Sequence, residues 1–244
     1  MPVYVVSGAR AGIGLQYIRQ LSQEKDNTVF ALVRRLDGDL AALREIQDRA
    51  IAIVHILECD VSSESSIASL PDRIRLSAKT DIKIDFLINN AAILHSRQET
   101  SLNMSSGALA SHITCNVVGP AKVLQALLPS LASNARVANI SSGIGSLTMV
   151  SDGRIDAEIT PYSISKTALN MLTVHQARQL ASGDATRGIT IVAVDPGHVK
   201  TEMGGPNAAI EVADSARGVL RVLAGLTLAD SGKFFLYTGD ELPW

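Results

Sequence analysis

The sequence predicts an α/β protein with a doubly wound, seven-stranded parallel sheet and helices on both faces. Short β-branched runs alternate with longer amphipathic stretches along the chain, as they do when helices connect parallel strands. Most of the short runs are apolar nearly throughout, which is typical of strands covered on both faces. No linker, repeat or low-complexity segment divides the 244 residues, so we expect a single domain over residues 1–244.

Seven runs are predicted as strands. In chain order they are Val3–Val6, Thr28–Val33, Ile51–Leu57, Ile84–Ile88, Arg136–Ile140, Ile189–Val194 and Phe234–Tyr237. Because helical patterns separate them, successive strands are expected to run parallel and to be joined by helical crossovers.

Helical patterns are clearest where apolar residues recur three or four positions apart. Two such faces are predicted, one from Gly14, Ile18 and Leu21, the other from Val123, Leu127 and Leu131. Thr160-Pro161 is typical of a helix start, with the threonine as the cap and the proline at the first helical position. The least patterned stretch, residues 146–160, is predicted to be a loop or a loose insertion.

The composition argues against several classes of partner. A net charge of −2 gives no indication of nucleic acid or membrane binding, and no apolar run reaches the roughly 20 residues that span a bilayer. No secretory signal is visible, so we expect a cytoplasmic protein. Cys59 and Cys115 have neither metal-ligand nor redox spacing, and we expect two buried thiols and no metal site.

A glycine-rich turn, SGARAGIG at residues 7–14, connects the first predicted strand to a helical pattern. This is the context that a dinucleotide-binding turn requires. Gly8 would allow the sharp reversal, Gly12 would let the backbone approach a pyrophosphate, and Gly14 would let the helix pack closely on the sheet. The helix N-terminus would then offer free N–H groups to the phosphates. A plain strand-to-helix turn is the alternative.

The residues after the second predicted strand favour NADP(H) over NAD(H). Proteins that bind NAD place an acidic residue there for the ribose hydroxyls, whereas this chain has Arg34 and Arg35. Arginine binds a 2′-phosphate through charge-assisted hydrogen bonds, and Arg10 in the glycine turn adds a second cation. The alternative is a solvated basic loop.

Tyr162 and Lys166 are four residues apart and would share one helix face. A tyrosine with its ordinary pKa of about 10 is a poor acid–base catalyst at neutral pH, and a nearby ammonium lowers that pKa. The pair predicts general acid–base chemistry, although any helix can carry this spacing.

Seven motifs occur in the order typical of short-chain dehydrogenases/reductases and cover essentially the whole chain. They are SGARAGIG from Ser7, DV at Asp60-Val61, NNAA from Asn89, CNVVG with Asn116, NISSGIG with Ser142, YSISK from Tyr162 and DPGHVKTEM from Asp195. The chain therefore resembles this family, and the resemblance implies a Rossmann fold and hydride transfer with a nicotinamide dinucleotide.

The resemblance implies a catalytic tetrad of Asn116, Ser142, Tyr162 and Lys166. Ser142 is preferred to its neighbour because the family's serine stands three residues before a glycine. Ser142 would stabilise the developing oxyanion, and Tyr162 would protonate the alkoxide. Lys166 would lower the tyrosine pKa and bind the nicotinamide ribose, while Asn116 would hold a water of a proton relay.

Cofactor-binding residues follow from the resemblance together with the glycine turn and its arginines. They are Ser7, Gly8, Arg10, Gly12, Ile13, Gly14, Arg34, Arg35, Asp60, Val61, Asn89, Asn90, Ala91, Tyr162, Lys166, Pro196, Gly197, Val199 and Thr201. By resemblance Asp60 contacts adenine, and residues 196–201 lie against the nicotinamide carboxamide. In the alternative interpretations Asp60 only caps the next segment, Asn89 and Asn90 only form a turn, and Thr201 is only a helix cap.

Two stretches narrow the branch of the family. TEMGGPNA after Lys200 and FFLYTGDELPW at the end resemble sniffer-like and C-factor-like carbonyl reductases, which include fungal ketoreductases of aromatic polyketide pathways. Ala92 departs from the family's usual glycine. The segment between Ser142 and Tyr162 is longer than the family's commonest form, and it is expected to form part of a substrate wall.

We therefore expect NADPH-dependent reduction of a ketone or aldehyde, with an aromatic polyketide-like compound as one candidate substrate. Two alternatives remain: an NADP-dependent alcohol dehydrogenase working oxidatively, and a non-catalytic, dinucleotide-binding regulatory or signalling protein. The expected partner is a small-molecule carbonyl compound. A homo-oligomer, dimer or tetramer, stays open because some family members with a longer insertion at this place are monomers.

Overall fold

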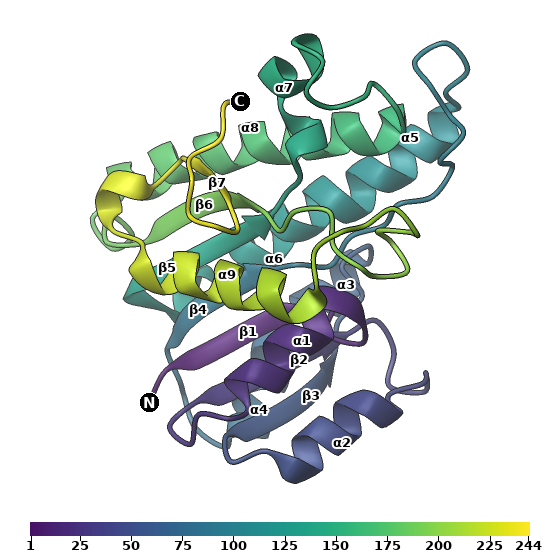
Figure 1. The fold of residues 1–244 in the computed structure, drawn as a ribbon. Helices are drawn as coiled ribbons and strands as arrows, with labels where there is room; N and C mark the ends of the chain where they lie inside the picture. Colours follow the sequence, from purple (N-terminus) through teal and green to yellow (C-terminus); the bar gives the residue numbers. More distant parts are fainter.

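The computed structural model describes residues 1–244 and contains one sheet of seven parallel strands in the order β3-β2-β1-β4-β5-β6-β7 (Figure 1). The strands are β1 (Val3–Ser7), β2 (Thr28–Val33), β3 (Ile53–Glu58), β4 (Ile84–Asn89), β5 (Leu131–Ile140), β6 (Thr190–Asp195) and β7 (Phe234–Leu236). The predicted doubly wound sheet is confirmed. Its strand order changes direction between β1 and β4, and ligands of such sheets bind beside the carboxyl ends of the strands at this point.

Helices cover both faces of the sheet. They are α1 (Gly12–Leu21), α2 (Ala41–Arg49), α3 (Glu64–Ala68), α4 (Leu70–Ala78), α5 (Ser106–Ile113), α6 (Gly119–Leu127), α7 (Leu147–Ser151), α8 (Thr160–Ser182) and α9 (Val212–Gly225). One π-helical turn and three 3₁₀ turns complete the set: Thr114–Val118, Leu128–Ser130, Gly143–Gly145 and Leu228–Asp230. None of the helices combines the length and the apolar character needed to span a bilayer.

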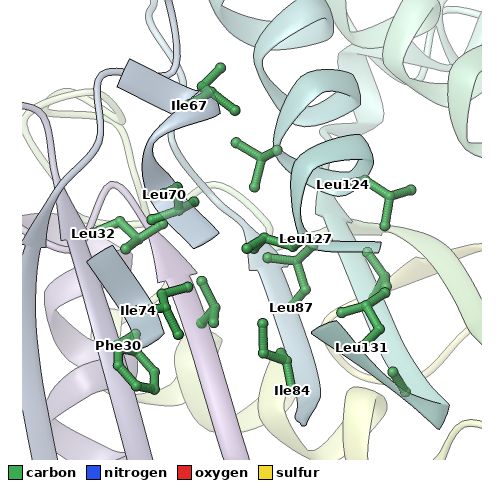
Figure 2. Packing of buried hydrophobic residues seen from close by; sticks show 14 of the residues in the cluster. Phe30, Leu32, Ile67, Leu70, Ile74, Ile84, Leu87, Leu124, Leu127 and Leu131 are labelled. Carbon is green, nitrogen blue, oxygen red and sulfur yellow. The ribbon is translucent and has the colours of Figure 1, made fainter. Parts of the chain in front are cut away.

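Two apolar cores of 22 buried residues each lie on the two faces of the sheet. Because neighbouring residues of a strand point to opposite faces, Val5 packs into one core and Val6 into the other. Helices α1, α2 and α9 cover the Val6 face, and α3, α4, α6 and α8 cover the Val5 face. Figure 2 shows the core on the Val5 face, where Ile74 of α4 and Leu127 of α6 point at the strands.

The strand predictions hold to within two residues except at the start of β5. This strand begins at Leu131, five residues before the predicted start, so Leu131 belongs to the sheet and not to the helix face assigned to it. Helix α6 ends at Leu127 because Pro129 follows within the 3₁₀ turn and cannot continue an α-helix. Both leucines are still buried in the same core.

The segment predicted as a loop contains a short helix, α7. Ser146 caps it, since its Oγ accepts a hydrogen bond from the Met149 N–H at 3.1 Å. The helix has five residues, none of them buried, so it lacks the apolar stripe from which a helix is predicted in a sequence.

Helix α8 begins at Thr160 itself, so the prediction that this threonine is the cap is wrong by one position. Ile159 occupies the cap position with a left-handed φ of 45°, and the Thr160 N–H donates to the Glu99 carbonyl at 3.2 Å. This backbone hydrogen bond to the segment between β4 and α5 satisfies an N–H of the first turn in place of a side-chain cap. Pro161 is accordingly the second residue of the helix, one position later than predicted, and still lies in the first turn.

Candidate active site

The glycine turn has the tight geometry that its spacing predicts. Gly8 and Gly12 have φ values of +70° and +57°, a region that L-residues with side chains rarely adopt. A Cβ on Gly14 would lie 2.2 Å from the Gly8 carbonyl oxygen, so only glycine lets α1 start directly against the turn. Ile13, between them, is half-buried. The turn therefore brings the N-terminus of α1 to the switch point of the sheet.

Side-chain hydrogen bonds join this turn to the segment that follows β4. The buried Ser7 Oγ accepts from the N–H groups of Asn90 and Ala91, both at 3.0 Å. Asn90 Nδ2 donates to the carbonyls of Ser7 and Gly8 at 3.0 and 3.3 Å. Asn89 points into the protein instead, where its Nδ2 donates to Asn139 Oδ1 at 2.9 Å. These residues hold the turn in place.

The arginines after β2 differ in their surroundings. Arg34 and Arg10 are exposed and have no ion-pair partner. Arg35 is exposed too, but it forms a two-point ion pair with Asp37 at 2.7 and 2.9 Å. Because that pair satisfies part of the Arg35 guanidinium, Arg34 is the freer cation for an incoming phosphate.

Asp60 and Val61 end the segment after β3. One oxygen of the Asp60 carboxylate accepts from the N–H and the hydroxyl of Ser62, at 2.9 and 2.6 Å. Asp60 is not the cap of α3, because Ser63 fills that role. The second oxygen of Asp60 has no partner in the protein, and Val61 is buried against Gly119. Asp60 thus keeps acceptor capacity for a ligand.

Tyr162 and Lys166 lie on the first turns of α8 in a buried environment. Lys166 Nζ donates to the Ile140 carbonyl at 2.8 Å and stands 5.4 Å from the centre of the Tyr162 ring. The Tyr162 hydroxyl makes no hydrogen bond within the protein, yet it is not enclosed in the way that the hydroxyl of Tyr17 is. It is therefore available to a ligand.

Burial moves the pKa values of this pair in opposite directions. It lowers the pKa of Lys166 to about 8, and it raises the pKa of Tyr162, with the Asp195 carboxylate adding to the rise. The expected lowering of the tyrosine pKa by Lys166 is not found here, because desolvation outweighs the effect of nearby cations. Tyr162 consequently carries its proton at neutral pH.

The two serines after β5 have different surroundings. Ser141 is buried, and its Oγ donates to Asn170 Oδ1 at 2.6 Å. Ser142 is half-buried and its hydroxyl has no partner in the protein. A donor that must reach a substrate cannot already be bound inside the core, so Ser142 is the better candidate of the two.

Asn116 lies in the π-helical turn Thr114–Val118, between α5 and α6. Its Oδ1 accepts from the Ile93 N–H at 2.8 Å, and its Nδ2 donates to the Ile93 carbonyl and to Ser165 Oγ, both at 3.0 Å. Ser165 Oγ in turn donates to the Tyr162 carbonyl at 2.7 Å. The amide therefore connects the segment after β4 to the helix that carries Tyr162. A π-turn inside a helix often marks a functional position.

The segment after β6 lies against the glycine turn. A Cβ on Gly12 would be 3.3 Å from the Thr201 methyl group, and Gly197 has a left-handed φ of +78° next to Pro196. Val199 is buried and forms an isolated bridge with Ile210. Thr201 Oγ1 accepts from the Gly204 N–H at 3.0 Å, and no helix begins at this residue.

One buried acid near the site stands in a motif of the sequence but was given no role there. Asp195 accepts hydrogen bonds from the N–H groups of Gly143 and Gly197, and its charge acts on Tyr162 and Lys166. The available signal was an acidic residue at the end of an apolar strand, immediately before Pro196.

Helix α7 borders the same region from the other side and is fastened to the C-terminal residues. The N–H of Thr148 donates to the Trp244 carbonyl at 2.9 Å, and Ser146 Oγ donates to the Pro243 carbonyl at 2.7 Å. The C-terminus and α7 lie close together in Figure 1. The stretch expected to form a substrate wall is thus held by the end of the chain.

These features fit a nicotinamide dinucleotide. The turn has no room for a Cβ at Gly8 or Gly14, a free N-terminus of α1 stands behind it, and two unpaired guanidinium groups flank it. The buried pair of Tyr162 and Lys166 lies at the carboxyl end of β5, where Lys166 donates to the Ile140 carbonyl. Residues from both halves of the chain therefore meet at one edge of the sheet.

Known proteins are similar to this chain in sequence or in fold. C-signal of Myxococcus xanthus is 40% identical over 164 residues, which are 66% of this chain and 93% of that protein. The norsolorinic acid ketoreductase of Aspergillus parasiticus is 28% identical over 255 residues, covering 99% and 91% of the two chains. The structure of NADPH-bound carbonyl reductase from chicken fatty liver superimposes over the full length of both chains, with a TM-score of 0.88 and 31% identity.

The family model described as short chain dehydrogenase matches residues 2–211. The resemblance predicted from seven ordered motifs is confirmed by this match and by the carbonyl reductase and ketoreductase among the similar proteins. The chain belongs to the short-chain dehydrogenase/reductase family.

Proposed function

We propose that this protein is an NADPH-dependent carbonyl reductase that converts a ketone or aldehyde to an alcohol. One observation carries the proposal: a buried, protonated Tyr162 presents a hydroxyl without a protein partner, next to Lys166. A general acid needs its proton and an open approach to the substrate oxygen, and Tyr162 has both.

The residues around Tyr162 complete the chemistry. Bound NADPH supplies the hydride. Ser142 Oγ donates a hydrogen bond to the substrate carbonyl oxygen, which gains negative charge during reduction. Tyr162 gives its proton to that oxygen. Lys166 binds the nicotinamide ribose and places a positive charge beside the tyrosine, and Asn116 orders the helix that carries both.

The cofactor residues support the phosphate form. Arg34 and Arg10 are the free cations for the 2′-phosphate, and the glycine turn with the N-terminus of α1 receives the pyrophosphate. The open oxygen of Asp60 accepts from adenine. The loop with Gly197 and Thr201 holds the nicotinamide.

The proposed substrate class is a bulky or planar ketone, with aromatic polyketide-like compounds first. The relative named norsolorinic acid ketoreductase covers nearly the full chain, which supports this class. The relative named C-signal supports a second candidate, a signalling role in which the dinucleotide is bound without turnover. The intact set of Ser142, Tyr162 and Lys166 favours reduction, because a binding protein needs no general acid.

The test is an NADPH-oxidation assay across a panel of ketones, aldehydes and quinones, followed by absorbance. We expect turnover of aromatic ketones or quinones with NADPH and slower turnover with NADH. Tight NADPH binding without oxidation by any carbonyl compound of the panel would favour the signalling candidate. Faster oxidation of alcohols with NADP⁺ than reduction of the matching ketones would favour the oxidative direction.

A further inference from the structure

Asp195 joins two segments that flank the site. It is the last residue of β6, and its side chain is buried, with 9% of the residue exposed. Its Oδ2 accepts from the Gly143 N–H at 2.9 Å, and its Oδ1 accepts from the Gly197 N–H at 2.8 Å. Gly143 directly follows Ser142, and Gly197 lies in the segment after β6. One carboxylate thus holds both turns.

The position is a demanding one for a charged group. No lysine, arginine or histidine forms an ion pair with Asp195, and burial raises the pKa of its carboxyl. The two N–H bonds act against that rise. An uncompensated buried carboxylate is costly, and here the two charge-assisted hydrogen bonds, followed by the nearby Lys166 ammonium, offset that cost.

The packing around Gly143 leaves this contact little freedom. A Cβ on Gly143 would lie 3.0 Å from Asp195 Oδ2 and 2.8 Å from Ile155 Cδ1. The carboxylate, the turn after Ser142 and the stretch before α8 therefore fit against one another without a gap. A shift of the carboxylate would move the Ser142 turn.

We propose that Asp195 is a positioning residue that clamps the Ser142 turn to the Gly197 loop and so fixes the oxyanion donor relative to the nicotinamide. This inference rests on the proposed reductase function. It adds a residue outside the tetrad whose side-chain hydrogen bonds both go to backbone N–H groups, one in the turn after β5 and one in the segment after β6.

The charge of Asp195 also acts on the catalytic pair. It raises the pKa of Tyr162 and the pKa of Lys166, because a carboxylate favours the protonated form of each. Arg97 lowers the pKa of Tyr162, and Lys166 and, less, His198 lower that of the Asp195 carboxyl. Asp195 therefore adds to the effect of burial in keeping the proton on the general acid, and it also places the neighbours of that acid.

Two further groups face the pair. The rings of His112 and Tyr162 pack edge to face, with their centres 6.2 Å apart. Burial lowers the pKa of His112, so this histidine is neutral near pH 7. Cys115 faces Lys166, and burial raises the pKa of the thiol. Neither carries charge near neutral pH. The alkaline side of the pH profile thus reports the tyrosine and the lysine, on both of which the Asp195 carboxylate acts through its charge.

The test uses Asp195→Asn, which keeps the size but offers one acceptor for two N–H groups. We expect about a 100-fold loss of kcat, the scale of a misplacement of about 1 Å in a reacting group. We also expect the alkaline limb of the pH–rate profile to move to lower pH, because the tyrosine and the lysine both lose a neighbour that favours their protons. Asp230→Asn is the matched control. That carboxylate accepts from the N–H and hydroxyl of Thr227 at 2.9 and 2.8 Å, away from the site, and the variant should keep wild-type kcat and pH profile.

Amide hydrogen exchange of the cofactor-free protein tests the clamp without turnover. In the wild type, Gly143 and Gly197 should exchange at least about 10-fold slower than Gly38, an exposed loop glycine whose N–H has no partner. Asp195→Asn should speed exchange at Gly143 or Gly197, and Asp230→Asn at neither.

Each outcome bears on one of the two proposals. Exchange at Gly143 and Gly197 as fast as at Gly38 overturns the clamp, even if the variant fails to fold. An unchanged kcat and pH profile in folded Asp195→Asn also overturns it. Protected glycines in a wild type that reduces no ketone would leave the clamp standing and remove the proposed function.

Discussion

Arg34 and Arg35 are adjacent in the chain, yet only one of them is free to bind a phosphate. Arg35 is held by Asp37 at 2.7 Å, whereas Arg34 has no ion-pair partner. A charge-assisted hydrogen bond contributes about 1.5–3 kcal/mol, so Arg34→Asp should weaken NADPH binding roughly 10- to 150-fold and NADH binding much less. Fluorescence titration with both dinucleotides measures the ratio.

The same charge change one residue later is the control for this cofactor prediction. Arg35→Asp should alter the NADPH/NADH affinity ratio less than Arg34→Asp does, because Asp37 already occupies part of that guanidinium. If the ratio is unchanged in Arg34→Asp, the assignment of this residue to the 2′-phosphate is wrong.

Tyr162 and Lys166 predict a specific pH dependence. Burial raises the pKa of Tyr162 and lowers that of Lys166 to about 8, so in this pair the lysine is the group that titrates first as the pH rises. Ketone reduction should be steady below this pH and decline through it. Lys166→Ala lacks that titration, so its weaker activity should extend to higher pH. A profile of kcat against pH identical to the wild type would contradict this role of Lys166.

At this scale the sequence identified the side chains but not their environment. The motifs named Ser142, Tyr162 and Lys166, and the structure places a free serine hydroxyl and the buried pair at one edge of the sheet. The pKa of Tyr162 could not be predicted from spacing, because desolvation by distant parts of the chain outweighs the local ammonium. Asp195 was missed because its two partners, Gly143 and Gly197, become neighbours only in the folded sheet.

The start of α1 depends on Gly14. A methyl group there would meet the Gly8 carbonyl oxygen at 2.2 Å, and backbone cannot move aside as a side chain can. Gly14→Ala should therefore lower the free energy of unfolding by about 1–3 kcal/mol or more and weaken NADPH binding at the same turn. Urea unfolding followed by circular dichroism measures the loss.

Gly107 offers the matched substitution in another helix. It lies exposed in the first turn of α5, and a Cβ there would meet no atom within 4 Å. Gly107→Ala should raise stability by about 0.4–1 kcal/mol, because alanine loses less conformational entropy in a helix. Equal effects of the two substitutions would show that the contact with Gly8 does not decide the geometry of α1.

Elements with a strong apolar period were predictable and those held by local polar contacts were not. The strands are covered on both faces, so their continuous apolar runs gave their positions closely. Helix α7 depends on the Ser146 cap and on contacts with Trp244, neither of which leaves a period in the sequence. The first residues of β5 include Ser133 and Asn134, which hid the extension of the strand toward Leu131.

The whole chain should unfold as one unit. Every strand belongs to one sheet, and residues from both ends of the chain share a core, so residues 1–244 are proposed to form a single domain. Calorimetry should show one transition. NADPH at about 100 times its Kd should stabilise the protein by about 2.7 kcal/mol, which raises Tm by roughly 5–10 °C. Two separate transitions, or a Tm indifferent to NADPH, would contradict this.

Tyr162→Phe tests the central claim most directly, because it removes only a hydroxyl that makes no bond within the protein. The ring that faces Lys166 stays, so NADPH binding should change by less than about threefold while kcat for ketone reduction falls by at least about 100-fold, the scale of general acid catalysis. Tyr17→Phe removes an enclosed hydroxyl elsewhere and should keep full activity. The measurement is kcat for the ketone beside the NADPH Kd of both variants. A Tyr162→Phe protein that reduces the ketone at the wild-type rate would contradict the account.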